Sequence, residues 1–213
     1  MGKQTQALKH AQLLPRAFFN RDPRQVAQEL LGKLIVRRHG RKIIAGRIVE
    51  VEAYLGQDDL AAHAAAGRTA RNQVLFGPPG HAYVYFIYGM YFCLNISCLP
   101  DGEPGCVLIR ALEPVSGIEQ MAKARGLEDD DVDFSRQSNL RRLTSGPGKL
   151  CDALGITRER DNGKDLLAAR SDLLVLDDGY PPKKVMATQR IGISKSTEMP
   201  LRYVIAGNAF ASK

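Results

Sequence analysis

The stretch from Lys42 to Leu55 constrains the fold more than any other part of the sequence, because it is long and rich in β-branched residues. A shorter stretch of the same kind, Leu34 to Arg37, precedes it, and a His39-Gly40 pair lies between the two. Glycine favours the tight turns that join antiparallel strands. The pattern therefore predicts a β-hairpin whose second strand is unusually long.

Side chains alternate between the two faces of a strand, so this long strand has a core face and an opposite face. The residues predicted to face the core are Val49, Val51 and Ala53. Glu50, Glu52 and Tyr54 then share the other face, where two carboxylates and a phenol meet. Glu52 and Tyr54 are candidate site residues for that reason, with His63 next along the chain. The spacing equally fits a surface strand with a solvated glutamate and a packed tyrosine, and a lone histidine is more often structural than catalytic.

The segment from Tyr83 to Asn95 holds four of the seven tyrosines in the sequence. An ordinary core strand has no need for phenols, whereas aromatic rings can stack on an unpaired nucleobase. Each stacked base contributes ~1–3 kcal/mol, which offsets much of the cost of extruding a base from a duplex. The segment therefore favours nucleic-acid contact, with a purely structural tyrosine-rich hairpin as the alternative.

The same segment predicts a hairpin that turns near Tyr88, because the glycine that follows it permits a positive backbone φ angle. A side chain at such a projecting turn can wedge into the minor groove of DNA. The sequence leaves the strand register open. A two-residue loop pairs Tyr85 with Phe92. A three-residue loop pairs Tyr85 with Cys93, on the face shared with Asn95.

Weaker patterns elsewhere predict further helices and strands. The expected helices span about residues 23–31, 57–66, 113–125 and 146–154, and each ends near a glycine. The expected strands span about residues 107–111, 173–176, 185–193 and 201–205. A length of 213 residues fits one compact domain, residues 1–213. Within it, residues 1–15 are expected to form a flexible N-terminal segment.

The formal net charge is +7, although Glu128 to Asp133 form a strongly acidic run. Excess positive charge favours a polyanionic partner, because neutralising phosphates releases condensed counterions and gives affinity that does not depend on base sequence. A basic protein without nucleic-acid function is the alternative. The acidic run fits a solvated or partly disordered loop, and no function is assigned to it.

Several basic residues are candidates for contacts with a phosphate backbone. Arg110 ends a predicted strand beside the tyrosine-rich segment, and Lys149 begins a helix whose free backbone N–H groups can receive a phosphate. The glycines before Lys149 lack the spacing of a nucleotide-binding P-loop. Further candidates are Arg68, Arg71, Arg141 and Arg142. Each of these four also fits a solvated surface charge.

The four cysteines show no C-x-x-C spacing and no closely placed histidine, which argues against a zinc site and favours reduced, packed thiols. The stretch from Met1 to Leu14 lacks the continuous apolar core of a signal peptide or membrane anchor. Residues 83–98 are apolar but too short to cross a bilayer. These features predict a cytoplasmic protein without membrane contact, associated with the nucleoid if it is bacterial.

Five segments, in a fixed order, carry a resemblance to a known family. They are Arg47–Gly56, Ala62–His63, Tyr83–Asn95, Arg110–Pro114 and Ser145–Leu150. From about Leu31 to Val204, the sequence resembles the alkyladenine DNA glycosylase family, also called the 3-methyladenine or methylpurine DNA glycosylase family. The resemblance implies a mixed α/β (α+β) fold in a single domain, with a curved antiparallel β-sheet, flanking helices and a protruding β-hairpin. It also implies no metal and no organic cofactor.

The resemblance implies roles for individual residues. Glu52 would be the general base that deprotonates a water for attack on the anomeric carbon of the sugar. Arg110 would help hold this water and the nearby phosphate, and Tyr88 would be the wedge. The resemblance also implies a base pocket. Its walls would be Tyr54, His63 and Tyr85, and Asn95 would discriminate against the exocyclic amine of normal guanine.

The activity implied is that of a monofunctional glycosylase of base excision repair, acting as a monomer on double-stranded DNA that contains damaged purines. The expected lesions are 3-methyladenine, 7-methylguanine, hypoxanthine and ethenoadenine. Alkylation at N3 or N7 makes a purine cationic, and an aromatic pocket attracts such a cation by of order 0.5–2 kcal/mol per contact. Hydrolysis by water would leave an abasic site without strand cleavage.

Two other functions fit parts of the pattern. A non-catalytic protein that binds damaged DNA would keep the tyrosines and the basic surface but would have no use for Glu52. A metal-dependent hydrolase would instead use Glu52, Asp58, Asp59 and His63 as its polar site.

Overall fold

The computed structural model describes residues 8–40, 42–128 and 132–212, and within these ranges nine strands form one open antiparallel sheet. The order is β1-β7-β2-β3-β6-β5-β4, with β9 pairing with both β3 and β8. The strands are β1 (Gln12–Leu13), β2 (Leu34–His39), β3 (Lys42–Tyr54), β4 (Ala82–Ile87), β5 (Tyr91–Cys98), β6 (Gly105–Ser116), β7 (Leu173–Asp177), β8 (Val185–Thr188) and β9 (Arg202–Ile205).

Short helices flank this sheet. They are α2 (Arg16–Phe19), α3 (Pro23–Leu30), α4 (Ile118–Ala124), α5 (Gln137–Thr144), α6 (Pro147–Ala153) and α7 (Arg158–Asp161), with 3-10 helices η1 (His63–Ala66) and η2 (Gln73–Phe76). Helices and strands mix along the chain, and the sheet is antiparallel. This confirms the predicted mixed α/β (α+β) single-domain fold.

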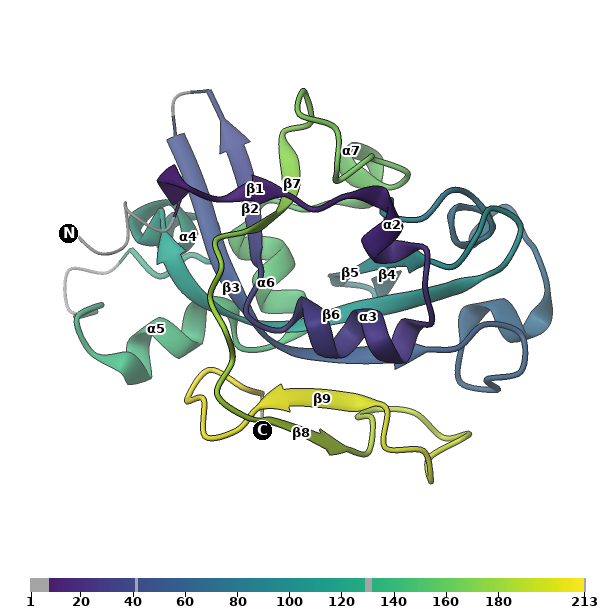
Figure 1. Ribbon diagram of the computed structural model, residues 1–213. Helices are drawn as coiled ribbons and strands as arrows, with labels where there is room; N and C mark the ends of the chain where they lie inside the picture. The colour runs from purple at the N-terminus through teal and green to yellow at the C-terminus, as the bar shows by residue number, and fades with distance from the viewer. Residues whose placement is uncertain (1–7, 41, 129–131, 213) are drawn as a thin grey trace.

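The long strand β3 crosses the middle of the molecule and pairs along both of its edges (Figure 1). β6 pairs with one edge, whereas the other edge pairs first with β2 and then, at residues 50–52, with β9. The register between β3 and β6 shifts on both sides of Glu50, so β-bulges bend the strands at that point. Glu50 and Glu52 consequently lie in the centre of the sheet, and both are fully buried.

The predicted helix after Asp22 is confirmed as α3, and its residues explain why it forms. The Asp22 carboxylate accepts a hydrogen bond from the Arg24 backbone N–H at 2.7 Å, and Pro23 occupies the first turn. Val26 and Leu30 lie one turn apart and are fully buried on the side that contacts β3 and β6. The same apolar cluster includes residues of α4, α5 and α6, so the helices and the sheet share one core.

The tyrosine-rich segment forms the hairpin β4–β5, whose loop contains three residues, 88–90. Tyr88 and Gly89 both have positive φ angles, 55° and 69°. A left-handed backbone is easy for glycine and uncommon for tyrosine, so the turn holds Tyr88 in a costly conformation. Tyr85 pairs with Cys93, which confirms the three-residue alternative for the register. The Tyr88 side chain projects from the tip and is 77% exposed.

Two elements are shorter in the structure than the sequence predicted. The helix predicted for residues 113–125 begins only at Ile118, because residues 113–116 pair with β3 and prolong β6. The strand predicted for residues 185–193 ends at Thr188, where β8 stops pairing with β9. In both cases strand pairing between distant segments decides the boundary, and it overrides the local propensity that the prediction used.

The helix predicted for residues 57–66 is also wrong, because turns and the single-turn helix η1 occupy this region. A helix over residues 57–66 would have Asp58 as its N-cap. Instead the neighbouring Asp59 is buried, and its carboxylate accepts two nearby backbone N–H groups at 3.2 and 3.1 Å. Side-chain hydrogen bonds of this kind compete with helix formation.

Within the segment predicted to be flexible, residues 1–15, backbone hydrogen bonds join Gln12 and Leu13 to β7 as strand β1. Residues 1–7 lie outside the described residues, as do residues 129–131 of the acidic run. Within the part of the chain that is described, no helix has both the length and the apolar character needed to span a membrane.

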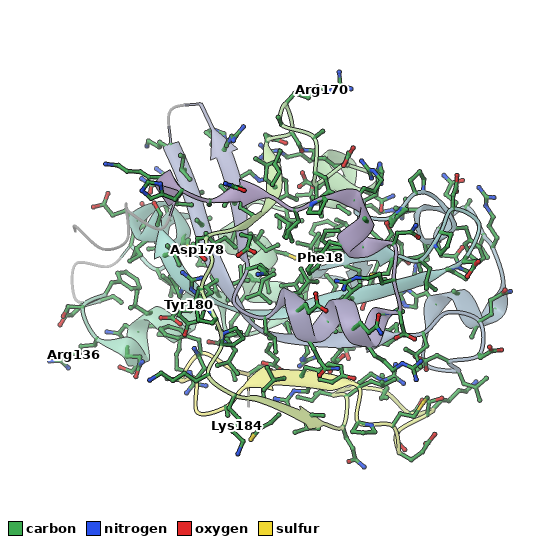
Figure 2. All side chains as sticks on the ribbon, in the orientation of Figure 1. Phe18, Arg136, Arg170, Asp178, Tyr180 and Lys184 are labelled. Carbon is green, nitrogen blue, oxygen red and sulfur yellow. The ribbon has the colours of Figure 1, made fainter. Side chains whose placement is uncertain are left out.

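The segment that follows β7 is anchored to β3 by Arg47. Its guanidinium donates two hydrogen bonds to the Asp178 carboxylate, at 2.8 and 2.7 Å, and lies 4.1 Å from the ring centre of Tyr180. Figure 2 labels Asp178 and Tyr180, which lie close together on this segment. The anchor fixes the course of the chain toward β8 and the loop that follows it.

Candidate active site

A cavity of about 520 Å³ lies beside the centre of the sheet, and most of the predicted site residues line it. These are Tyr54, His63, Tyr85, Tyr88, Asn95, Arg110 and Lys149. They come from separate strands, loops and helices, so only the sheet topology brings them together. The volume suits a small organic ligand, and the lining combines aromatic rings with a few polar groups.

Glu52 lies directly behind the wall of this cavity. Its carboxylate accepts hydrogen bonds from the Tyr54 hydroxyl at 2.9 Å and from the Ile191 backbone N–H at 2.8 Å, and Arg110 Nη1 lies 3.2 Å from Oε1. All three of these partners line the cavity. Burial raises the pKa of Glu52 above its ordinary value, although Arg110 and the two hydrogen bonds oppose it. A raised pKa makes an ionised carboxylate a better proton acceptor.

Arg110 is shared between Glu52 and Glu50. Its Nε donates to Glu50 Oε1 at 2.8 Å, and Glu50 also accepts hydrogen bonds from Arg202 and from the backbone N–H and hydroxyl of Ser212. Burial acts to raise the pKa of Glu50, but the hydrogen bonds from Ser212 and Arg110 outweigh it, and the pKa lies below its ordinary value. Glu50 therefore stays ionised and holds Arg110 with Nη1 facing Glu52.

His63, Tyr83 and Tyr85 pack as one aromatic group. His63 Nδ1 lies 2.8 Å from the Tyr83 hydroxyl oxygen, and its ring centre lies 4.5 Å from that of Tyr85 at an interplanar angle of 68°. No planar ligand fits between rings this close, so they form one side of the cavity. Although His63 keeps an exposed edge, burial of the rest of the ring and the nearby Arg71 lower its pKa, and the imidazole is neutral at neutral pH.

Asn95 lines the cavity with a side chain that is almost fully buried. Its Nδ2 donates to the Tyr83 carbonyl at 3.2 Å, and its Oδ1 accepts from the Cys106 thiol at 3.8 Å. These two contacts fix the orientation of the amide. Burial raises the pKa of the Cys106 thiol to about 12, so the thiol remains protonated. All four cysteines are buried and free, as predicted.

A second cavity, of about 570 Å³, adjoins the first and is strongly basic. The residues shared by the two cavities are Arg110, Gly146, Pro147 and Lys149. Arg141 and Arg142 of α5 also line the second cavity, and neither they nor Lys149 form an ion pair within the described residues. The Ser145 hydroxyl on the same wall is buried, and it has no hydrogen-bond partner in the described part of the chain. The arrangement suits an anion.

The two remaining basic candidates differ in position. The Arg71 guanidinium lies 5.8 Å from the ring centre of Tyr85, so it stands at the aromatic wall of the first cavity. Arg68 is exposed and lines neither cavity. Across residues 8–40, 42–128 and 132–212, no group of three or more His, Cys, Asp or Glu side chains is arranged to hold a metal ion.

The site also depends on residues to which the sequence analysis gave no role in it. They are Glu50, Arg190, Ile191, Arg202 and Ser212. Of these residues, only Glu50 could have been identified from the sequence, because the strand alternation places it on the same face as Glu52. The others reach the site from far along the chain, with 139 positions between Ile191 and Glu52, and no local pattern marks them.

The sequence of this chain matches a known protein family. The model of the methylpurine-DNA glycosylase family matches residues 17–209. The chain belongs to this family. A relative from Koribacter versatilis is 62% identical over 199 residues, which cover 93% of this chain and 92% of that protein.

Two further relatives of this methylpurine-DNA glycosylase support the same assignment. One from Burkholderia cenocepacia is 47% identical, covering 94% of this chain and 91% of that protein. One from Methanocella arvoryzae is 48% identical, covering 89% of each chain. The names of all three relatives assign them to 3-methyladenine DNA glycosylases. The family resemblance inferred from the sequence is thus confirmed, and the chain is a DNA repair hydrolase that acts on damaged DNA.

Proposed function

We propose that this glycosylase extrudes alkylated or deaminated purines from duplex DNA and hydrolyses their N-glycosidic bond with water, leaving an abasic site and an uncut strand. The proposed lesions are 3-methyladenine, 7-methylguanine, hypoxanthine and ethenoadenine. One observation carries the proposal. A buried carboxylate with a raised pKa, that of Glu52, lies 3.2 Å from Arg110 behind the wall of an aromatic cavity.

In the proposed reaction, Glu52 accepts a proton from a water molecule that stands between it and the sugar. The water oxygen then bonds to the anomeric carbon, while the bond to the purine breaks and its electron pair leaves with the base. Arg110 helps to hold the water and the neighbouring phosphate. A positioned general base contributes about 10²–10⁴-fold to such a step.

The aromatic side chains hold the extruded base. Tyr54 faces one side of the base, and the contacting pair His63 and Tyr85 face the other. Their π-systems attract a cationic purine, and the lowered pKa of His63 keeps it from adding a repelling positive charge. Asn95 discriminates against the amine of normal guanine, because its amide is fixed by two hydrogen bonds and cannot turn away.

The basic cavity and the hairpin tip bind the rest of the DNA. Lys149 and Arg141 contact the phosphate backbone, with the unpartnered Ser145 hydroxyl beside them. Tyr88 enters the space that the extruded base leaves, since it is 77% exposed at the tip of the hairpin. Arg71 lies close enough to the aromatic wall to contact the backbone next to the lesion, and Arg68 contributes at longer range.

A panel of duplexes, each with one modified purine at the same position, tests this proposal by the release of free base. We expect release from several lesions, none from the unmodified duplex, and strand cleavage only after alkali treatment. Binding without release from every lesion would overturn the proposal in favour of a non-catalytic damage-binding protein. Repeating the assay in excess EDTA separates this mechanism from metal-dependent hydrolysis, because Glu52 and water require no metal.

A further inference from the structure

Asp59 and Arg190 form a buried ion pair beside the first cavity, 131 positions apart in the chain. Arg190 Nη1 and Nη2 donate to the two carboxylate oxygens of Asp59 at 2.5 and 2.9 Å. Neither side chain is accessible to solvent. Taking two charges out of water is costly, so a buried ion pair is weak evidence for stability on its own. The other contacts of Arg190 indicate a different role.

The first of these contacts involves Tyr54, one of the two uncharged groups that hydrogen-bond to Glu52. The Arg190 guanidinium carbon lies 4.7 Å from the ring centre of Tyr54, and Nη1 donates to the Ala53 carbonyl at 3.1 Å. The guanidinium therefore packs against the ring whose hydroxyl donates to Glu52 at 2.9 Å. Arg190 restrains both the ring and the strand that carries it.

The second contact involves Ile191, whose backbone N–H is the other uncharged donor to Glu52. Ile191 follows Arg190 in a loop that begins after β8 ends, and Arg190 Nη2 also donates to the Ser196 carbonyl in the same loop, at 3.3 Å. Among residues 189–196 of the described chain, Arg190 is the only residue whose side chain donates hydrogen bonds. Its side chain thus fixes the loop at the position next to Ile191.

We infer that Arg190, anchored by Asp59, is a positioning residue that holds the Ile191 N–H and the Tyr54 hydroxyl against Glu52. The inference rests on the proposed function, in which Glu52 is the general base. Both donors stabilise the ionised carboxylate, so losing them raises the pKa of Glu52 and keeps the base protonated up to a higher pH. The other charged or titratable groups that face Glu52 are Arg110, Glu50 and Cys93, and these stay in place.

The test is the pH dependence of 7-methylguanine release by the full chain, in single turnovers with saturating enzyme and with spontaneous loss subtracted. A cationic purine leaves without being protonated, so the acid limb of the profile reports the general base alone. Arg190→Gln is expected to move the midpoint of this limb upward by about one pH unit, the effect of losing hydrogen bonds to a charged group.

A second variant separates positioning from simple electrostatics. Asp59→Asn combined with Arg190→Gln removes one negative and one positive charge together, yet it releases the loop and the Tyr54 ring in the same way. We expect the same upward shift. Arg37→Gln is the matched control, because Arg37 is equally buried, pairs with Asp161 at 2.6 Å and lines neither cavity. It should lower stability and leave the midpoint unchanged.

An unshifted midpoint in the folded double variant would overturn the inference, as would an equal shift in Arg37→Gln. If Arg190→Gln alone does not fold, the double variant decides, because it leaves no unpaired buried charge. Failure of the unmodified enzyme to release 7-methylguanine would refute the proposed function instead. That result appears before any variant is measured, so the two failures are distinguishable.

Discussion

Glu50 and Glu52 lie two positions apart on one face of β3, both fully buried, and the protein shifts the pKa of their carboxyl groups in opposite directions. Ser212, Arg110 and Arg202 surround Glu50 with hydrogen-bond donors. Glu52 lies behind the cavity wall, and its own partners, Tyr54, Ile191 and Arg110, line the cavity. The two glutamates therefore differ in role: Glu50 holds the arginine that lies between them, and Glu52 is the proton acceptor in the proposed reaction.

Replacing Glu52 with glutamine should slow catalysis strongly without weakening the fold. Because the pKa of Glu52 is raised, its stabilising contribution is complete below the ordinary glutamate value and is lost as the pH rises through the raised value. At neutral pH the neutral amide therefore removes a destabilising buried charge. We expect release to fall by about 10²–10⁴-fold. Thermal melting at pH 7 should show a Tm no lower than that of the wild type, and a clear drop would contradict this account.

Replacing Glu50 with glutamine should have the opposite effect on stability. Its pKa is lowered, so its contribution is present above the ordinary glutamate value and is lost as the pH falls through the lowered one. Breaking a buried ion pair on one side costs roughly 3 kcal/mol in the free energy of unfolding. Urea unfolding of both proteins at pH 7 and at acid pH measures this, and the difference should shrink in acid. Equal stability at pH 7 would argue against the assigned network.

The pH dependence of release by the wild type follows from the same carboxylate. Glu52 must be ionised to accept a proton, so the rate of 7-methylguanine release should rise with pH. Its midpoint should lie above the ordinary glutamate pKa of about 4.3, since burial raises the pKa. Single-turnover rates across the acid range give this midpoint. A value at or below the ordinary one would show that another group limits the reaction.

Replacing Tyr88 with alanine should weaken binding to lesion duplex more than it slows hydrolysis of the bound lesion. The side chain stands at the exposed hairpin tip, and in the proposed reaction it sustains the extruded state without contacting the reacting atoms. Equilibrium titration gives the affinity, and single-turnover rates at saturating enzyme give the chemical step. Equal affinity of both proteins for the lesion duplex would rule out a wedge at this position.

Lys149→Ala should make DNA binding less sensitive to salt. Each phosphate contact contributes about −0.9 to the slope of log affinity against log salt, so losing one contact should reduce the slope by about that amount. Arg141→Ala should act similarly from the neighbouring wall of the basic cavity. Arg170→Ala is the control, because Arg170 is exposed and lines neither cavity (Figure 2). An unchanged slope in Lys149→Ala would remove this residue from the interface.

Features that depend on near neighbours could be predicted from the amino-acid sequence alone. Asp22 and Pro23 were enough to place the start of α3, because capping acts over a few residues. The alternation along β3 placed Glu50 and Glu52 on one face, since a strand repeats every two residues. Together with the family motifs, this local information was sufficient to predict the fold class and seven of the residues that line the first cavity, although not Ile191.

Which distant segments meet is visible only in the folded protein. The prolonged strand β6 and the contacts of Glu50 and Arg190 depend on segments far apart in the chain. The register of the hairpin β4–β5, which the sequence left open, is a local feature that the structure decided. Asp59 lies within the helix that the sequence predicted for residues 57–66, and its partner Arg190 lies 131 positions away. Such contacts are stabilised by burial and strand pairing in the assembled core. A local sequence pattern cannot predict them, because the partners are distant in the chain.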